Sequence, residues 1–80
     1  MGYHKSKIIK GTLGEFSKIE EEFLEFKDAW EQNIPILQLV ELSDMIGAIE
    51  FYIKKYNLTI QDLIDMNELT KSAFQDGRRS

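Results

Sequence analysis

The sequence predicts an all-α protein with three helices per protomer, which oligomerises into a helical bundle. Apolar residues recur three and four positions apart, turn-forming residues divide the chain twice, and alternating strand-like runs with hairpin turns are missing. The expected helices cover about residues 12–32, 35–56 and 59–75. Eighty residues suffice for one domain, so residues 1–80 are expected to form a single unit in which 1–11 are a basic lead-in.

The first helix is predicted from an apolar stripe and a start signal. Thr12 followed by Glu15 has the spacing of a capping box, which predicts a helix that begins at Thr12. The apolar positions at helical spacing are Phe16, Ile19, Phe23, Phe26 and Trp30. The segment Asn33-Ile34-Pro35 then ends the helix, because proline disfavours the helical conformation of the residue before it.

The second and third helices follow from similar signals. Pro35 is well suited to the first turn of the second helix. Residues 57–59 are expected to form a short connection between the second and third helices. Thr59 with Asp62 predicts an N-cap for the third helix. Gly77 suits the left-handed position at its carboxyl end.

Composition excludes several classes of protein. The net charge of −4 disfavours nucleic acid as a partner, because a phosphate backbone attracts a basic surface. With no cysteine, the chain forms neither disulfides nor thiolate zinc sites. No segment approaches the roughly 20 apolar residues that span a bilayer, and no signal peptide is apparent. We therefore expect a cytoplasmic protein with no membrane or nucleic-acid partner.

Two acids of the second helix fall within its apolar stripe. On a helical wheel Glu41 lies beside Met45, Ala48, Ile49 and Tyr52, and Asp44 lies beside Leu37 and Phe51. An ionised carboxylate in an apolar interior costs several kcal/mol unless a cation, a proton or a metal ion compensates it. Lys55 alone would not neutralise both acids, so a structural salt bridge explains this pair poorly.

The first helix carries acids at the same spacing. Glu22 borders the apolar stripe, whereas Glu25 and then Glu21 lie further round and are expected to be less buried than the acids of the second helix. Because a short connection makes neighbouring helices antiparallel, Glu22 and Glu25 are expected to face Glu41 and Asp44. Four clustered carboxylates repel one another unless they bind a hard cation, so we expect Mg²⁺, with Mn²⁺ as a possible substitute.

These acids resemble the signature of the MazG-like nucleotide pyrophosphohydrolases, an all-α family related to dimeric dUTPase and phosphoribosyl-ATP pyrophosphohydrolase. That group carries E-E-x-x-E on one helix and E-x-x-D on the next, as in residues 21–25 and 41–44 of this chain. The likeness extends over residues 11–79. Many members have a further helix before the first motif, whereas this sequence has the short basic lead-in.

The resemblance implies Mg²⁺-dependent hydrolysis of a nucleoside triphosphate between its α- and β-phosphates. It assigns the metal ligands as Glu22, Glu25, Glu41 and Asp44, with Glu21 as the residue that orients or deprotonates the attacking water. A polyphosphate also needs cations beside four acids. The candidate substrate-binding residues are Lys71, Arg78 and Lys10, with Asn67 as a hydrogen-bonding partner of a base.

The amount of apolar surface predicts that protomers pair as a homodimer or homotetramer, with the active site near a subunit boundary. Candidates for a second contact surface are Leu24, Leu39, Val40 and Ile53. Two alternatives remain open: a non-enzymatic helical adaptor that binds a partner helix, and an enzyme like phosphoribosyl-ATP pyrophosphohydrolase.

Overall fold

The computed structural model describes residues 4–75, with side chains up to residue 72, and each regular element within that range is a helix. The elements are α1 (Phe16–Glu31), α2 (Pro35–Ile53), the short 3₁₀ helix η1 (Lys54–Tyr56) and α3 (Ile60–Gln75). The prediction of an all-α chain with three helices is therefore confirmed over residues 4–75.

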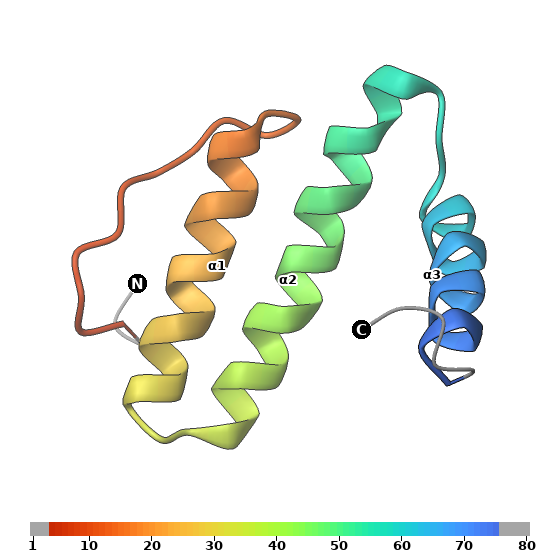
Figure 1. The fold of residues 1–80 in the computed structure, drawn as a ribbon. Coiled ribbons are helices and arrows are strands. Elements are labelled where there is room, and N and C mark those ends of the chain that lie inside the picture. The colour runs from red at the N-terminus through yellow and green to blue at the C-terminus, as the bar shows by residue number, and fades with distance from the viewer. Residues whose placement is uncertain (1–3, 76–80) are drawn as a thin grey trace.

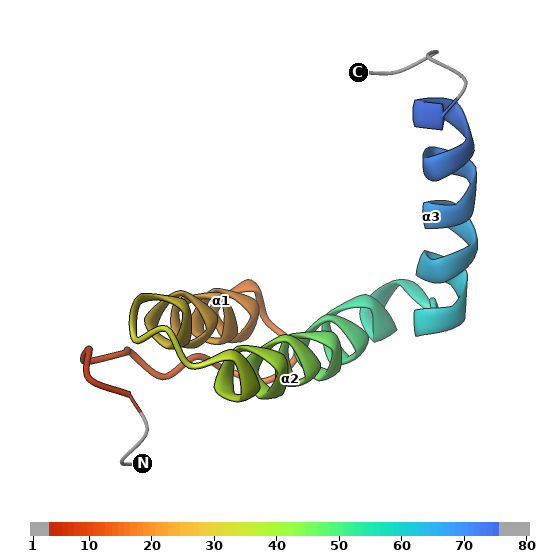
Figure 2. The same ribbon diagram turned by 90° about the horizontal axis from the view of Figure 1, so that it is seen from below.

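Two of the three helices, α1 and α2, form a flat pair, and α3 projects from it. Helices α1 and α2 run antiparallel and side by side, and the lead-in passes along α1 (Figure 1). Helix α3 turns away at the end of α2 and stands clear of α1 (Figure 2). The site is therefore built from the α1–α2 pair and the lead-in, while α3 lies outside it.

Both α1 and α2–η1 end at an asparagine in the left-handed conformation. Asn33 has φ 64° and Asn57 has φ 59°, and the N–H of each donates to a carbonyl of the preceding helical turn. Asparagine adopts this conformation more readily than most residues, so it suits the end of a helix. The predicted turns at Asn33 and Asn57 are thus confirmed.

The predicted start of the third helix is confirmed as well. The amide of Thr59 donates to Asp62 Oδ2 at 2.7 Å, and the amide of Asp62 donates to Thr59 Oγ1 at 3.3 Å. This reciprocal pair satisfies two amides that lack a partner within the helix. The helix extends to Gln75, and Gly77 lies outside the described residues.

The predicted start of the first helix at Thr12 is wrong. The chain makes a tight turn in which the Glu15 amide donates to the Thr12 carbonyl at 3.0 Å, and Gly14 has φ +90°. Glu15 occupies the N-cap position and α1 begins at Phe16, without a side-chain cap. The left-handed glycine cannot continue a right-handed helix, so the Thr12–Glu15 spacing marks a turn here.

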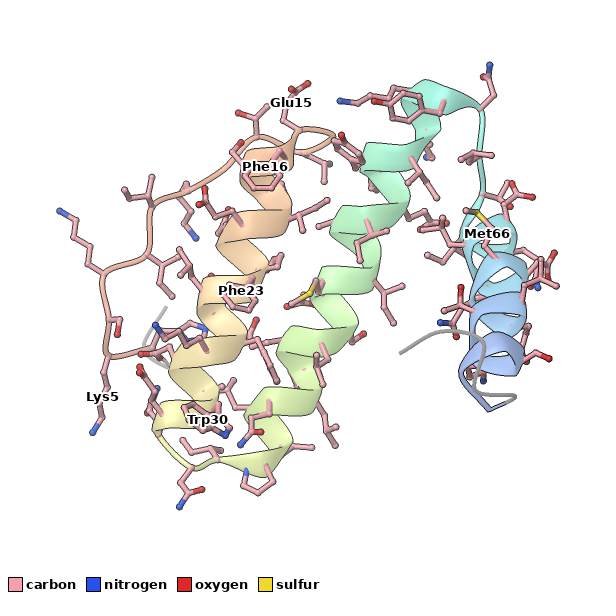
Figure 3. The ribbon with its side chains drawn as sticks, in the orientation of Figure 1. Lys5, Glu15, Phe16, Phe23, Trp30 and Met66 are labelled. Atoms are coloured by element: carbon pink, nitrogen blue, oxygen red, sulfur yellow. The ribbon has the colours of Figure 1, made fainter. Side chains whose placement is uncertain are left out.

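The apolar stripe predicted for the first helix does not form a core within one protomer. In the described part of the chain, the buried apolar residues are two alanines and two larger residues: Ala29, Leu37, Ala48 and Ile53. Phe16 and Trp30 are 67% and 62% exposed, and with the exposed Phe23 they form a row along α1 that we call the aromatic row (Figure 3). Ile53 is buried inside the protomer, so its assignment to a second contact surface is wrong.

The whole molecule is more extended than its length suggests. Its radius of gyration is 14.9 Å, whereas a compact domain of this length has a value of about 12 Å. Its accessible surface is 6199 Å², compared with about 5000 Å² for a compact monomer of the same mass. Within residues 4–75, no helix combines the length and the hydropathy that crossing a membrane requires.

Candidate metal centre

The sequence-predicted acids come together between α1 and α2. Glu22, Glu41 and Asp44 place one carboxylate oxygen each within 4.8 Å of one another. The same holds for Glu21, Glu22 and Glu25, so the two groups share Glu22. We refer to these five residues as the acidic cluster. Oxygen atoms this close suit a divalent cation that binds them at roughly 2.0–2.6 Å.

Two buried oxygens of the acidic cluster lack a partner. Glu22 is 6% exposed and Glu41 is 5% exposed. Among the described residues, Glu22 Oε2 and Glu41 Oε1 accept no hydrogen bond. A buried carboxylate oxygen without a partner is costly unless a cation or a proton compensates it, so these two atoms distinguish Glu22 and Glu41 from the other buried acids.

The pKa values of Glu22 and Glu41 reflect the same cost of burying an ionised carboxylate. Burial and the neighbouring Glu25 carboxyl group raise the pKa of Glu22 to about 7. Burial and the charge of Glu25 also raise the pKa of Glu41, although its contact with His4 acts in the opposite direction. A raised pKa favours the protonated form of both carboxyl groups, and a metal ion bound by them would displace that proton.

Glu21 is the most buried acid of the cluster, which corrects the expectation that it lies furthest from the core. It is 2% exposed and accepts hydrogen bonds from the Gly11 amide at 2.8 Å and from Lys18 Nζ at 3.2 Å. Lys10 Nζ lies 3.5 Å from its other oxygen. Burial opposes ionisation, but these donors hold the pKa of Glu21 below its usual value. The lead-in covers Glu21, and a wheel of one helix does not show that cover.

Asp44 is exposed, so the expectation that it lies inside a buried apolar stripe is wrong. It stands at the rim of the acidic cluster, where its carboxylate still reaches Glu22 and Glu41. Helix α1 packs against α2 while α3 stands away from that pair (Figure 2), and Glu41 is buried where Asp44 is not. The cluster therefore has a buried side at Glu22 and Glu41 and an accessible side at Asp44.

The predicted substrate-binding residues divide between two places. Lys10 lies beside the acidic cluster through its ion pair with Glu21. Lys71 and Asn67 lie on α3, away from the cluster, and Lys71 Nζ is 3.1 Å from Glu68 of the same helix. Arg78 lies outside the described residues. Within one protomer the structure thus does not bring Lys71 and Asn67 to the acids.

Two residues of the centre, His4 and Asp28, were not among the metal-site residues assigned from the sequence. His4 Nδ1 lies 2.9 Å from Asp28 Oδ2, and His4 Nε2 lies 2.9 Å from Glu41 Oε2. The available signal was the spacing of Glu21, Glu25 and Asp28, four and then three residues apart, which places all three on one face of α1. The only histidine of the chain lies in the lead-in, and nothing local predicts that it folds back onto this face.

Asp28 anchors the lead-in. It accepts hydrogen bonds from the amides of Lys5 and Ser6 at 3.1 and 3.0 Å and from Gln32 Nε2 at 2.7 Å, in addition to the His4 contact. Although burial opposes ionisation, these contacts hold the pKa of Asp28 well below its usual range. Burial likewise opposes the charge of His4, but Asp28 and Glu41 raise the pKa of the imidazole. Asp28 is therefore a firmly ionised acceptor that orients His4.

Comparisons with protein-family models, with curated proteins and with solved structures found no match to this chain. The chemistry of the centre is therefore inferred from its own residues. A partly buried set of carboxylates with two unpartnered oxygens and an accessible rim suits a hard divalent cation that still has coordination positions open to a ligand.

Proposed function

We propose that this protein is a Mg²⁺-dependent pyrophosphohydrolase that cleaves a nucleoside triphosphate between the α- and β-phosphates. The observation that carries the proposal is the pair of unpartnered, buried oxygens on Glu22 and Glu41. They belong to an acidic cluster whose spacing resembles the MazG-like motifs in residues 21–25 and 41–44. A purely structural role for these acids would require protons to compensate both oxygens, whereas a bound cation compensates them together.

The acidic cluster would hold Mg²⁺ through Glu22, Glu25, Glu41 and Asp44. Bound there, the ion would neutralise phosphate oxygens and lower the pKa of a coordinated water. Asp44 lies at the exposed rim, so a polyphosphate can approach from that side. Glu21 is held by Gly11 and Lys18 and has a lowered pKa, which favours orienting the water over accepting its proton.

Cations must offset the repulsion between the acids and a polyphosphate. Lys10 and Lys18 already lie at the cluster. Lys71 and Asn67 lie on the projecting α3. We therefore propose that α3 of a second copy brings these two residues to the acidic cluster, which makes the active site a property of a homo-oligomer.

The exposed apolar surface supports that oligomer. The protomer exposes 6199 Å², an excess of about 1200 Å² over a compact monomer of its mass. A stable interface removes about 800 Å² from each partner. The aromatic row, together with the exposed Leu24, Leu39 and Val40, supplies apolar contacts of the kind that interfaces bury.

The test is release of pyrophosphate from a panel of ribo- and deoxyribonucleoside triphosphates and phosphoribosyl-ATP, with and without Mg²⁺. We expect Mg²⁺-dependent release by the wild type and at least about a 100-fold lower rate for Glu41→Gln, because a lost metal ligand weakens charge stabilisation by several kcal/mol. Glu50→Gln is the matched control, because Glu50 lies on the same helix and is exposed.

No release from any compound of the panel by a folded protein would argue against the hydrolase. If Mg²⁺ also failed to raise its melting temperature, the adaptor alternative would be favoured. Release from phosphoribosyl-ATP alone would assign the activity to that substrate.

A further inference from the structure

The lead-in places a nitrogen ligand next to the acidic cluster. One oxygen each of Glu25 and Glu41 lies, together with a ring nitrogen of His4, within 4.8 Å of one another. Glu41 thus belongs both to this group and to the all-oxygen group with Glu22 and Asp44. The two groups of ligand atoms therefore share the Glu41 carboxylate.

The orientation of His4 matches that of a metal-binding histidine. Its Nδ1 faces Asp28 Oδ2 at 2.9 Å, which leaves Nε2 directed at Glu41. Histidines that bind metals usually donate their second ring N–H to a carboxylate or a carbonyl, which fixes the ring and makes the ligand nitrogen a better donor. Asp28 supplies the carboxylate that faces the second ring nitrogen of His4. Three further hydrogen bonds, from Lys5, Ser6 and Gln32, keep Asp28 in place.

A second observation concerns Glu41, the carboxylate that both groups share. Glu41 is 5% exposed, and its Oε1 has no hydrogen-bond partner in the part of the chain that the structure describes. His4 contacts only the other oxygen, Oε2. An ion between His4 and the two carboxylates would give Oε1 or Oε2 a partner while Nε2 remained in its present position.

We propose that His4, Glu25 and Glu41 form a second cation site with mixed nitrogen and oxygen ligands, which favours a transition-metal ion such as Mn²⁺ over Mg²⁺. Imidazole binds transition ions well, whereas Mg²⁺ prefers oxygen ligands and retains its water. Asp28 is the positioning residue of this site, since it contacts the ring and not the ion. The inference rests on the metal-binding part of the proposed function but does not require hydrolysis.

The direct test is pulsed electron paramagnetic resonance of Mn²⁺ bound to the untagged wild-type protein. The chain has one histidine, so labelling with ¹⁵N-histidine assigns any imidazole nitrogen coupled to Mn²⁺ to His4 without a variant. We expect a nitrogen modulation that changes with the label. Bound Mn²⁺ without histidine coupling would overturn the proposal and leave His4 as an anchor of the lead-in.

Three variants test the same point through affinity. His4→Gln should weaken Mn²⁺ binding at least about tenfold and change Mg²⁺ binding less, and Asp28→Asn should weaken Mn²⁺ binding about tenfold while the nitrogen coupling persists. Lys7→Gln, an exposed change in the same lead-in, should leave both affinities unchanged. Equal losses of Mn²⁺ and Mg²⁺ affinity in His4→Gln would contradict a selective second site.

The outcomes separate this inference from the proposed function. A wild type that binds neither Mg²⁺ nor Mn²⁺ refutes the metal centre as a whole, and with it both proposals. A wild type that releases pyrophosphate with Mg²⁺ but shows no histidine coupling to Mn²⁺ refutes only the second site.

Discussion

At the residue scale, the unusual property of this protein is that several acidic residues are buried while many of its large apolar side chains are exposed. Glu21, Glu22, Asp28 and Glu41 are buried, yet they differ in how they are compensated. Asp28 and Glu21 receive hydrogen bonds from the lead-in, which keep them ionised. Glu22 and Glu41 each keep one oxygen without a partner in the described chain, so only these two depend on a proton or an added ion.

This difference predicts how stability depends on pH without metal. The pKa of Glu22 rises from 4.5 to about 7 on folding, so between these pH values the folded state binds more protons than the unfolded state. The free energy of unfolding should therefore fall as pH rises across that window, by on the order of 2 kcal/mol. His4 and Glu41, whose pKa values are also raised, act in the same direction. Urea unfolding from pH 5 to 8 in a metal chelator measures the effect.

Substitution and metal provide the controls for this pH dependence. Glu22→Gln should flatten the decline, because the amide stays neutral in both states, whereas the exposed Glu20→Gln should leave it in place. Mg²⁺ at 100 times its dissociation constant should add about 2.7 kcal/mol to the wild type at pH 8. A stability that rises between pH 5 and 7 without metal would show that Glu22 is not protonated by folding.

At the element scale, the lead-in contributes as much to the centre as the helices do. Its residues 4–11 have no regular secondary structure, but the Gly11 amide binds Glu21 and His4 binds both Asp28 and Glu41. Gly11 is required for this path, because a Cβ atom there would collide with the Ser17 carbonyl at the start of α1. The lead-in is therefore held against the helices at residues 4–6 and again at Gly11.

Gly11→Ala should accordingly loosen the lead-in and destabilise the protein by about 1–3 kcal/mol. Gly47→Ala is the matched control, since nothing lies within 4 Å of a Cβ atom at that position of α2. Replacing this mid-helix glycine should stabilise the protein by up to about 1 kcal/mol. Thermal or chemical unfolding of both variants gives the comparison, and equal stability of the two would contradict the close approach at Gly11.

The features that were predicted correctly from the sequence depend on neighbouring residues. The turns after α1 and η1 and the start of α3 were predicted, because Asn33, Asn57 and the Thr59–Asp62 pair act on their immediate neighbours. The proximity of the acids of α1 and α2 was predicted from their spacing along each helix and from the short connection between the helices. The burial of Glu21, the exposure of Asp44 and the role of His4 were not, because each depends on where the lead-in and α3 lie in space.

At the scale of the whole molecule, the flat α1–α2 pair and the projecting α3 leave the protomer without a compact core. Among the residues whose burial the structure describes, the buried apolar ones are Ala29, Leu37, Ala48 and Ile53, while the aromatic row is open to solvent (Figure 3). Phe16, Phe23 and Trp30 are seven residues apart, which is the spacing of a helix–helix seam. Such a surface is expected to associate with a second copy of the chain.

Trp30 provides a direct measure of that association, because it is the only tryptophan and is 62% exposed in one protomer. At micromolar concentration we expect light scattering to give the mass of a dimer or tetramer, with Trp30 emission shifted to the blue and protected from iodide. Dilution should reverse both optical signals together. Phe23→Glu should disrupt the oligomer, whereas Glu31→Gln, a change at an exposed charged position, should not. A monomer with exposed Trp30 at all concentrations would contradict the proposed oligomer.

The contact of His4 with Glu41 has a consequence for the order of folding. It joins residues 37 positions apart, whereas α1 and α2 are linked by the turn at residues 32–34. Closing the longer loop costs more chain entropy, and contacts between nearby residues tend to form first. The helical hairpin should thus appear early after refolding begins, and the ability to bind a cation should follow only when the lead-in docks.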